Sequence, residues 1–205
     1  MREFNEKDYT VIVEDFTKNI QYDGSQIQAH YTTEKYGKIG NSILIFRGGM
    51  KLSSREMIDL KDIIRESHLA NILISADDAL HFIIEEFDVQ PPNIEIAYLR
   101  LRLLTQILIE ELQKNSIFPS RNHTDIYVED KKLNVGIATI SPTSIKIHFG
   151  VNITDTGIPK HVKAIGLQQL GISEENLYDF ALNISKNYIM EVRRIKEDCA
   201  KTRPV

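Results

Sequence analysis

The polar side chains between residues 125 and 153 are those whose types and spacing could do chemistry. Asp125 to Glu129 and Lys132 to Thr139 alternate polar and apolar residues, and Ile145 to Ile153 repeats the alternation. Alternation in a strand places every second side chain on one face. One face would therefore carry Asp125, Tyr127, Lys132, Asn134, Lys146, His148 and Asn152. Such a set suits an anionic ligand, although antiparallel sheets also often present a polar face to water.

The first two segments are close enough in sequence to form a hairpin. A turn at Asp130-Lys131 would pair Glu129 with Lys132, Tyr127 with Asn134 and Asp125 with Gly136. The opposite face would be core, made of Ile126, Val128, Leu133, Val135, Ile137, Ile145, Ile147, Phe149, Val151 and Ile153. The sequence thus predicts three adjacent strands with one apolar and one polar face.

Arg47 is a second candidate for contact with an anion. Ser42 to Phe46 has the pattern of a buried strand, which would place Arg47 at its end, before Gly48-Gly49. The forked guanidinium binds carboxylate or phosphate through two hydrogen bonds, although an arginine after a strand is also an ordinary surface residue. We expect Arg47 to lie within reach of the polar face.

The remaining elements favour an α+β domain, with a largely antiparallel sheet packed against helices. We expect a strand at Tyr9 to Glu14, a loop from Gln26 to Gly40, and helices at Ser75 to Phe87, at 93–115 and from Ser173 onward. The apolar stripe of the second helix would be Ile96, Leu99, Leu103, Ile107 and Leu112. With 205 residues, the sequence fits a single domain spanning residues 1–205.

Metal, nucleic acid and membrane are not expected partners. Asp78 and His81 would form half of a metal site on the first helix, but no matching Glu-x-x-His occurs, and the one cysteine, Cys199, excludes a cysteine-rich zinc site. A net charge of −4 and a pI near 5.9 argue against nucleic-acid binding. No apolar run could span a bilayer and no signal peptide is evident, so the sequence predicts a cytoplasmic protein.

The hairpin residues also carry a family resemblance. Asp125-Ile126, Val128, Asp130-Lys131-Lys132-Leu133 and Gly136, with Phe149-Gly150-Val151-Asn152-Ile153 beyond, resemble the hairpin and following strand of biotin and lipoate protein ligases. The whole chain, including Tyr22-Asp23-Gly24-Ser25-Gln26 and 42–48, resembles more closely domain-of-unknown-function family 366. That family has the class II aminoacyl-tRNA synthetase and biotin synthetase fold and no established activity.

The resemblance implies a role for Lys132. In the ligases, the lysine at this position contacts the substrate carboxylate and the α-phosphate of the acyl-adenylate. The chain departs from the ligase pattern nearby, because Glu129-Asp130 replaces an Asp-Gly turn and Asn134-Val135 stands in place of Ser/Gly-Gly. It also lacks the Gly-Arg-Gly-Arg-Arg-Gly stretch of biotin ligases and the Arg-Arg-x-x-Gly-Gly-Gly run of lipoate ligases.

Two functions follow as hypotheses. The first is a ligase or acyltransferase that forms an acyl-adenylate from a small carboxylic acid and ATP, with Lys132 as the catalytic residue and an acceptor protein as a further partner. Arg47, Asp125, Asn134, His148 and Asn152 would bind substrate. The second is a non-catalytic protein that binds a nucleotide or a carboxylate metabolite. No tightly bound cofactor is expected, and a homodimer is an open alternative to a monomer.

Overall fold

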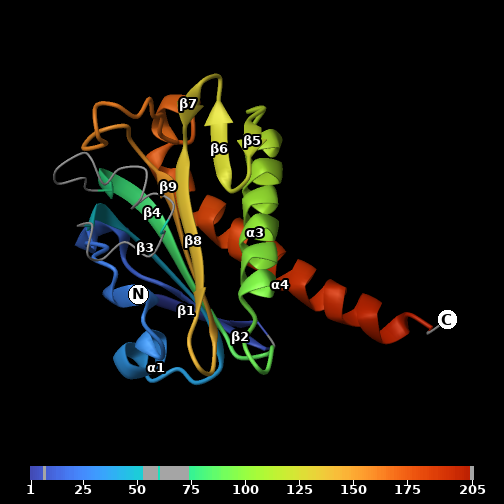
Figure 1. Ribbon diagram of the computed structural model, residues 1–205. Helices are drawn as coiled ribbons and strands as arrows, with labels where there is room; N and C mark the ends of the chain where they lie inside the picture. Colours follow the sequence, from blue (N-terminus) through green and yellow to red (C-terminus); the bar gives the residue numbers. More distant parts are fainter. Residues whose placement is uncertain (7, 53–59, 61–73, 204–205) are drawn as a thin grey trace.

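A six-stranded sheet forms the centre of the molecule (Figure 1). The computed structural model describes residues 1–6, 8–52, 60 and 74–203. The strand order is β1-β2-β3-β4-β9-β8, and all neighbours are antiparallel except β2 and β3. The strands are β1 (Arg2–Glu6), β2 (Tyr9–Val13), β3 (Asn41–Leu52), β4 (Ile74–Glu86), β8 (Asn134–Ile140) and β9 (Ile145–Asn152). The predicted α+β class and largely antiparallel sheet are confirmed.

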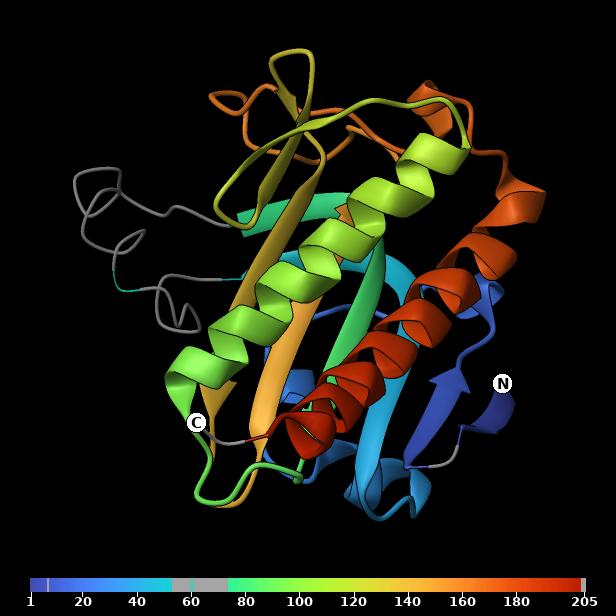
Figure 2. The same ribbon diagram turned by 90° about the vertical axis from the view of Figure 1, so that its right-hand side faces the viewer.

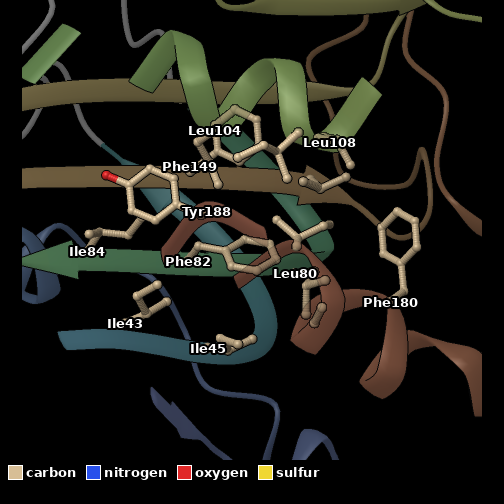
Figure 3. Packing of buried hydrophobic residues seen from close by; sticks show 14 of the residues in the cluster. Ile43, Ile45, Leu80, Phe82, Ile84, Leu104, Leu108, Phe149, Phe180 and Tyr188 are labelled. Atoms are coloured by element: carbon tan, nitrogen blue, oxygen red, sulfur yellow. The ribbon is translucent and has the colours of Figure 1, made fainter. Parts of the chain in front are cut away.

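Two long helices cover one face of this sheet, which we call the helix face (Figure 2). They are α3 (Ile94–Lys114) and α4 (Leu177–Lys201). Asn93 caps α3, because its Oδ1 accepts hydrogen bonds from the backbone N–H groups of Glu95 and Ile96. Figure 3 shows side chains of both helices packed on those of the central strands. This packing forms the main hydrophobic core, as the apolar periodicity of both helices predicted.

The opposite face, which we call the loop face, is covered by the segment between β2 and β3. This segment contains three short helices, η1 (Phe16–Lys18), η2 (Ser25–Ile27) and α1 (Tyr31–Tyr36), where the sequence suggested a loop from Gln26 onward. Tyr22, Tyr31 and Tyr36 pack here against apolar side chains of β3 and β4. The central strands are therefore buried on both faces.

The expectation of a helix from Ser75 to Phe87 is wrong, because these residues form most of β4. Short apolar runs are ambiguous between helix and strand, and here β3 and β9 supply backbone partners on both sides. The hydroxyl of Ser75 donates to the carbonyl of Gly157 instead of capping a helix. The sequence also has an apolar run at 69–75, most of which lies outside the described residues.

Two smaller expectations are also corrected. Strand β3 does not end at Phe46 but continues through Arg47 to Leu52. In α3, Ile107 and Leu112 are buried as expected, whereas Leu99 is 60% exposed. The buried side of α3 instead includes Ala97, Leu101, Leu104 and Leu108.

A small three-stranded sheet lies beside the upper end of α3 in Figure 1, made of β5 (Ser120–Asn122), β6 (Asp125–Val128) and β7 (Lys131–Lys132). The remaining short helices, η3 (Gln168–Leu170) and η4 (Glu174–Asn176), precede α4. Among the described residues, no helix is long and apolar enough to cross a membrane.

Gly48 lets the segment before η2 pair closely with β3. The N–H of Ile20 donates to the carbonyl of Arg47 at 2.8 Å, and the N–H of Tyr22 donates to that of Gly49 at 2.9 Å. A Cβ at Gly48 would lie 2.0 Å from the carbonyl oxygen of Ile20. We predict that Gly48→Ala lowers the free energy of unfolding by about 1–3 kcal/mol in urea denaturation, because backbone must move. Gly150→Ala is the control, because the three atoms nearest its added Cβ are all side-chain atoms, at 3.2 Å or more, and an equal loss in both variants would contradict this reason.

Candidate functional site

The hairpin that carries Lys132 has a different register from the expected one. Tyr127 pairs with Lys132 and Val128 with Lys131, so the turn is Glu129-Asp130 rather than Asp130-Lys131. Glu129 has a φ of 58°, the left-handed conformation that such a tight turn needs. The shift is two residues, so Lys132 remains on the same face of the hairpin as Asp125 and Tyr127.

The strand changes sheets at Leu133, and this breaks the alternation. The N–H of Leu133 donates to Ile126 in the small sheet, while its carbonyl accepts from Asn152 in the main sheet. Beyond it, Asn134 lies opposite Val151 on the helix face, and Ile137 lies opposite His148 on the loop face. The prediction that Val135 and Ile137 share a core face with Phe149 is therefore wrong.

Lys132 lies over this hairpin with its ammonium beside Asp125. Nζ of Lys132 is 2.9 Å from Oδ1 of Asp125, and the two side chains are 27% and 33% exposed. Leu133, next in the chain, is completely buried. A lysine ammonium has three N–H donors, so an ion pair with one carboxylate leaves donors for a ligand. The expected cross-strand pairing of Lys132 with Glu129 is wrong, because Glu129 lies in the turn and Tyr127 is opposite Lys132.

Asn134 and Asn152 hold this pair in place through their side-chain amides. Oδ1 of Asn134 accepts from the N–H of Ile126 at 2.7 Å, and its Nδ2 donates to the carbonyl of Thr124 at 2.9 Å. Both backbone groups flank Asp125. Nδ2 of Asn152 donates to the carbonyls of Lys132 at 3.3 Å and Ile165 at 3.2 Å. The structure thus shows these two buried amides bound to backbone, where the sequence suggested ligand contacts.

His148 belongs to a buried aromatic cluster on the loop face. Its Nε2 is 3.0 Å from Nδ1 of His81, and Nε2 of His81 is 3.1 Å from the carbonyl oxygen of Gly48. The ring of Tyr22 stacks on that of His148, with centroids 3.7 Å apart. Both histidines are at most 2% exposed. The expected water-facing surface at His148 is therefore a closed layer.

The hydrogen-bond pattern assigns the protons of this pair. A carbonyl oxygen can only accept, so Nε2 of His81 carries a proton and its Nδ1 accepts from Nε2–H of His148. Burial lowers the pKa of His81 to about 4, with the Gly48 carbonyl opposing that shift. Burial, and then the neighbouring His81, lowers the pKa of His148 well below its ordinary value. Both rings are neutral at pH 7.

Arg47 does not join the loop face. It lies opposite Leu80, and Leu80 packs in the core under the helices, whereas His148 lies opposite Ile83 on the other side of the sheet. Nε and NH2 of Arg47 bind the two carboxylate oxygens of Asp78 at 2.8 and 2.7 Å, and NH1 contacts Glu174 before α4. The expectation that Arg47 lies within reach of the polar face is therefore wrong for the part of that face that carries His148.

The candidate metal pair is also separated. Asp78 binds Arg47 on the helix face, while His81 contacts His148 on the loop face. Among the described residues, no group of three or more His, Cys, Asp and Glu side chains could hold a metal ion.

A small recess in the described surface lies far along the sheet from the hairpin, where Tyr9 meets Ile189 and Lys196 of α4.

The family can be assigned from the whole chain. The model described as domain of unknown function (DUF366) matches residues 11–203. The chain belongs to this family. An uncharacterised protein of Methanocaldococcus jannaschii is 38% identical over 186 residues, which are 91% of this chain and 81% of that protein.

Solved structures extend the comparison. A protein of unknown function from Pyrococcus horikoshi has a TM-score of 0.85 at 35% identity, over 96% of this chain and 99% of its own. Biotin protein ligase from Aquifex aeolicus, in complex with biotin and ATP, has a TM-score of 0.57 at 14% identity over 94% of this chain and 73% of its own. A putative lipoate protein ligase from T. acidophilum with bound lipoic acid has a TM-score of 0.56 at 10% identity over 88% of this chain and 85% of its own. The DUF366 chain therefore has the biotin/lipoate ligase fold.

Sequence reasoning missed the partners that enclose the loop face of this DUF366 protein. The helix expected from Ser75 to Phe87 hid His81 and Glu85, which could be found only by first recognising residues 74–86 as a strand, since both then face the same way. Tyr22, the other partner, lies between η1 and η2, far from His148 in sequence.

Proposed function

We propose that this protein binds a small carboxylic acid through Lys132 and joins it to ATP as an acyl-adenylate, acting as a ligase or acyltransferase. The observation that carries the proposal is the partly exposed Lys132–Asp125 pair on the hairpin of a ligase fold. In the reaction, a carboxylate oxygen attacks the α-phosphorus of ATP, and pyrophosphate leaves with the electrons of the broken P–O bond. A lysine ammonium stabilises the negative charge that develops between the two reactants.

Asp125 would orient the ammonium in this proposal. With one N–H directed at Oδ1 of Asp125, the remaining donors have fixed directions toward an incoming oxygen. The amides of Asn134 and Asn152 fix the backbone on both sides of the pair. Arg47 contributes no ligand contact in this account, because Asp78 and Glu174 already hold its guanidinium.

Binding without turnover is the second candidate function. It is favoured by the fact that Lys132 and Arg47 both already pair with protein carboxylates. The ligand would then be a nucleotide or a carboxylate metabolite, held by the same lysine. Release of pyrophosphate from ATP in the presence of carboxylic acids separates the two candidates, because only the ligase or acyltransferase produces it.

We predict that Lys132→Ala weakens ligand binding by about 1.5–3 kcal/mol, roughly tenfold or more in dissociation constant, because a charge-assisted hydrogen bond is lost. Calorimetric titration measures this with the acid or nucleotide that gives the largest thermal shift. Lys163→Ala is the matched control, since Lys163 also pairs with a hairpin carboxylate, that of Asp130, but its side chain is 74% exposed. Equal affinities of wild type and both variants would refute the role of Lys132.

A further inference from the structure

A row of polar side chains, Ser42, Glu85 and Lys146, crosses the loop face beside His148. Lys146 lies two positions before His148 on β9, so both side chains are on this face. Ser42 of β3 lies opposite Glu85 of β4, and Glu85 lies opposite Lys146 of β9. Each of these side chains is 1% exposed. The N–H of His30 donates to Oε1 of Glu85 at 2.8 Å. Thr32, two residues further along the chain, is also 1% exposed. Charged and hydroxyl groups thus gather around one buried carboxylate.

The acceptor atoms of this carboxylate already have partners. Oε1 of Glu85 accepts from the N–H of His30 and from the hydroxyl of Ser144 at 2.9 Å. Oε2 lies 3.0 Å from Nζ of Lys146, which makes an ion pair. Glu85 therefore offers little further hydrogen-bonding capacity to its neighbours.

Donors, by contrast, are left over. Oγ of Ser42 and Oγ1 of Thr32 form no hydrogen bond with any described residue, and Nζ of Lys146 has three N–H donors, of which the ion pair with Glu85 uses one. Buried polar atoms without partners destabilise a protein, so they are almost always satisfied by protein, water or ligand. A guest in this row must supply oxygen acceptors.

The charge of the row restricts the guest further. Glu85 and Lys146 cancel each other, and the neighbouring His148 is neutral, so an anion would add an uncompensated buried charge. An uncharged acceptor adds none. Water, a hydroxyl or an amide carbonyl meets this condition.

We propose that the Ser42–Glu85–Lys146 row is a binding site for an uncharged oxygen acceptor, occupied by water when no ligand is bound. The site is separate from the Lys132–Asp125 pair and does not depend on the activity proposed there. Lys132 and Lys146 would then take different ligands, because the acid binds Lys132 whereas the row around Lys146 excludes anions.

Crystal structures of the full chain test the proposal. Three are compared: one without ligand, one after a soak in formamide as the uncharged acceptor, and one after a soak in sodium bromide as the anion. We expect water or the formamide oxygen within hydrogen-bond distance of Nζ of Lys146 and Oγ of Ser42. Anomalous signal from bromide at this position would overturn the proposal. A row without any guest, with the donors bonded directly to protein acceptors, would overturn it equally.

Water relaxation dispersion tests the same site in solution. The long-lived water signal should fall in Ser42→Ala and remain in Ser185→Ala. Ser185 is the matched control because it is as buried as Ser42, but its hydroxyl already donates to the carbonyl of Ala181. Identical signals in wild type and both variants would contradict the enclosed water.

Discussion

Glu86→Ala is expected to lower the free energy of unfolding by about 3–5 kcal/mol, the range for breaking a buried ion pair. Glu86 is completely buried and accepts hydrogen bonds from Tyr9, from Tyr188 at 2.9 Å and from Arg100 at 2.7 Å. These partners come from β2, α4 and α3, so one carboxylate joins both helices to the sheet. Its loss leaves two tyrosine hydroxyls without an acceptor and removes one anion beside Arg100. Urea denaturation followed by circular dichroism measures the change.

Two variants serve as controls for Glu86→Ala. Glu86→Gln keeps the shape and an acceptor oxygen, so it should lose less stability than the alanine variant. Glu191→Ala removes an acid of α4 that pairs with Arg194 at the surface, and we expect a change within about 0.5 kcal/mol. If Glu86→Ala were as mild as Glu191→Ala, the network would not hold the layers together.

Stability is also expected to fall as the pH is lowered from about 6.5 toward 4, because His81 and His148 are buried and neutral. Their pKa values are lower in the folded protein than in the unfolded chain, with that of His81 at about 4. In this window the unfolded chain binds protons that the native state does not. The loss approaches about 1.4 kcal/mol per pH unit for each histidine well below pH 6.5, where the unfolded imidazole is fully protonated, so about 3 kcal/mol is lost between pH 6.5 and 5 for the pair.

Urea midpoints at pH 7, 6 and 5 measure this effect, and His148→Gln should reduce the slope by roughly half. Asp88 does not interfere. Burial opposes its ionisation, but hydrogen bonds from Arg100 and Lys196 outweigh this and lower the pKa of Asp88 to about 2, so the stability it contributes is lost only below about pH 3.8. A wild-type stability that is constant between pH 6.5 and 5 would contradict a buried neutral pair.

More of the fold than of the candidate site could be predicted from the sequence. Periodicity located both long helices, because each buries one stripe, and the strands around Lys132, because polar and apolar residues alternate along them. Strand β4 escaped this reasoning because it is buried on both faces and its polar and apolar residues do not alternate. Its consecutive acids Glu85 and Glu86 resemble a solvated helix end in the sequence, yet each is buried on a different face beside its own cation, Lys146 or Arg100.

The prediction of the site failed for two reasons, one at Leu133 and one in the segment that carries Tyr22. Alternation assumed one continuous strand, but Leu133 passes between two sheets and exchanges the faces of the residues after it. Tyr22 covers His148 from a segment more than a hundred residues away in sequence, and no local pattern signals that contact. Lys132 shares a face with Asp125 and Tyr127 as expected, because the two-residue error in register preserves the face of a strand, but it lies in a different sheet from His148.

The most direct test of the proposed function is isotope exchange between pyrophosphate and ATP, measured with the purified chain and a panel of small carboxylic acids. The account predicts exchange that depends on one class of acid, persists in Lys163→Ala and is lost in Lys132→Ala. Exchange that continues at the wild-type rate in Lys132→Ala would contradict the role of this lysine. No exchange with any acid, alongside Lys132-dependent binding in calorimetry, would contradict catalysis and leave a binding protein.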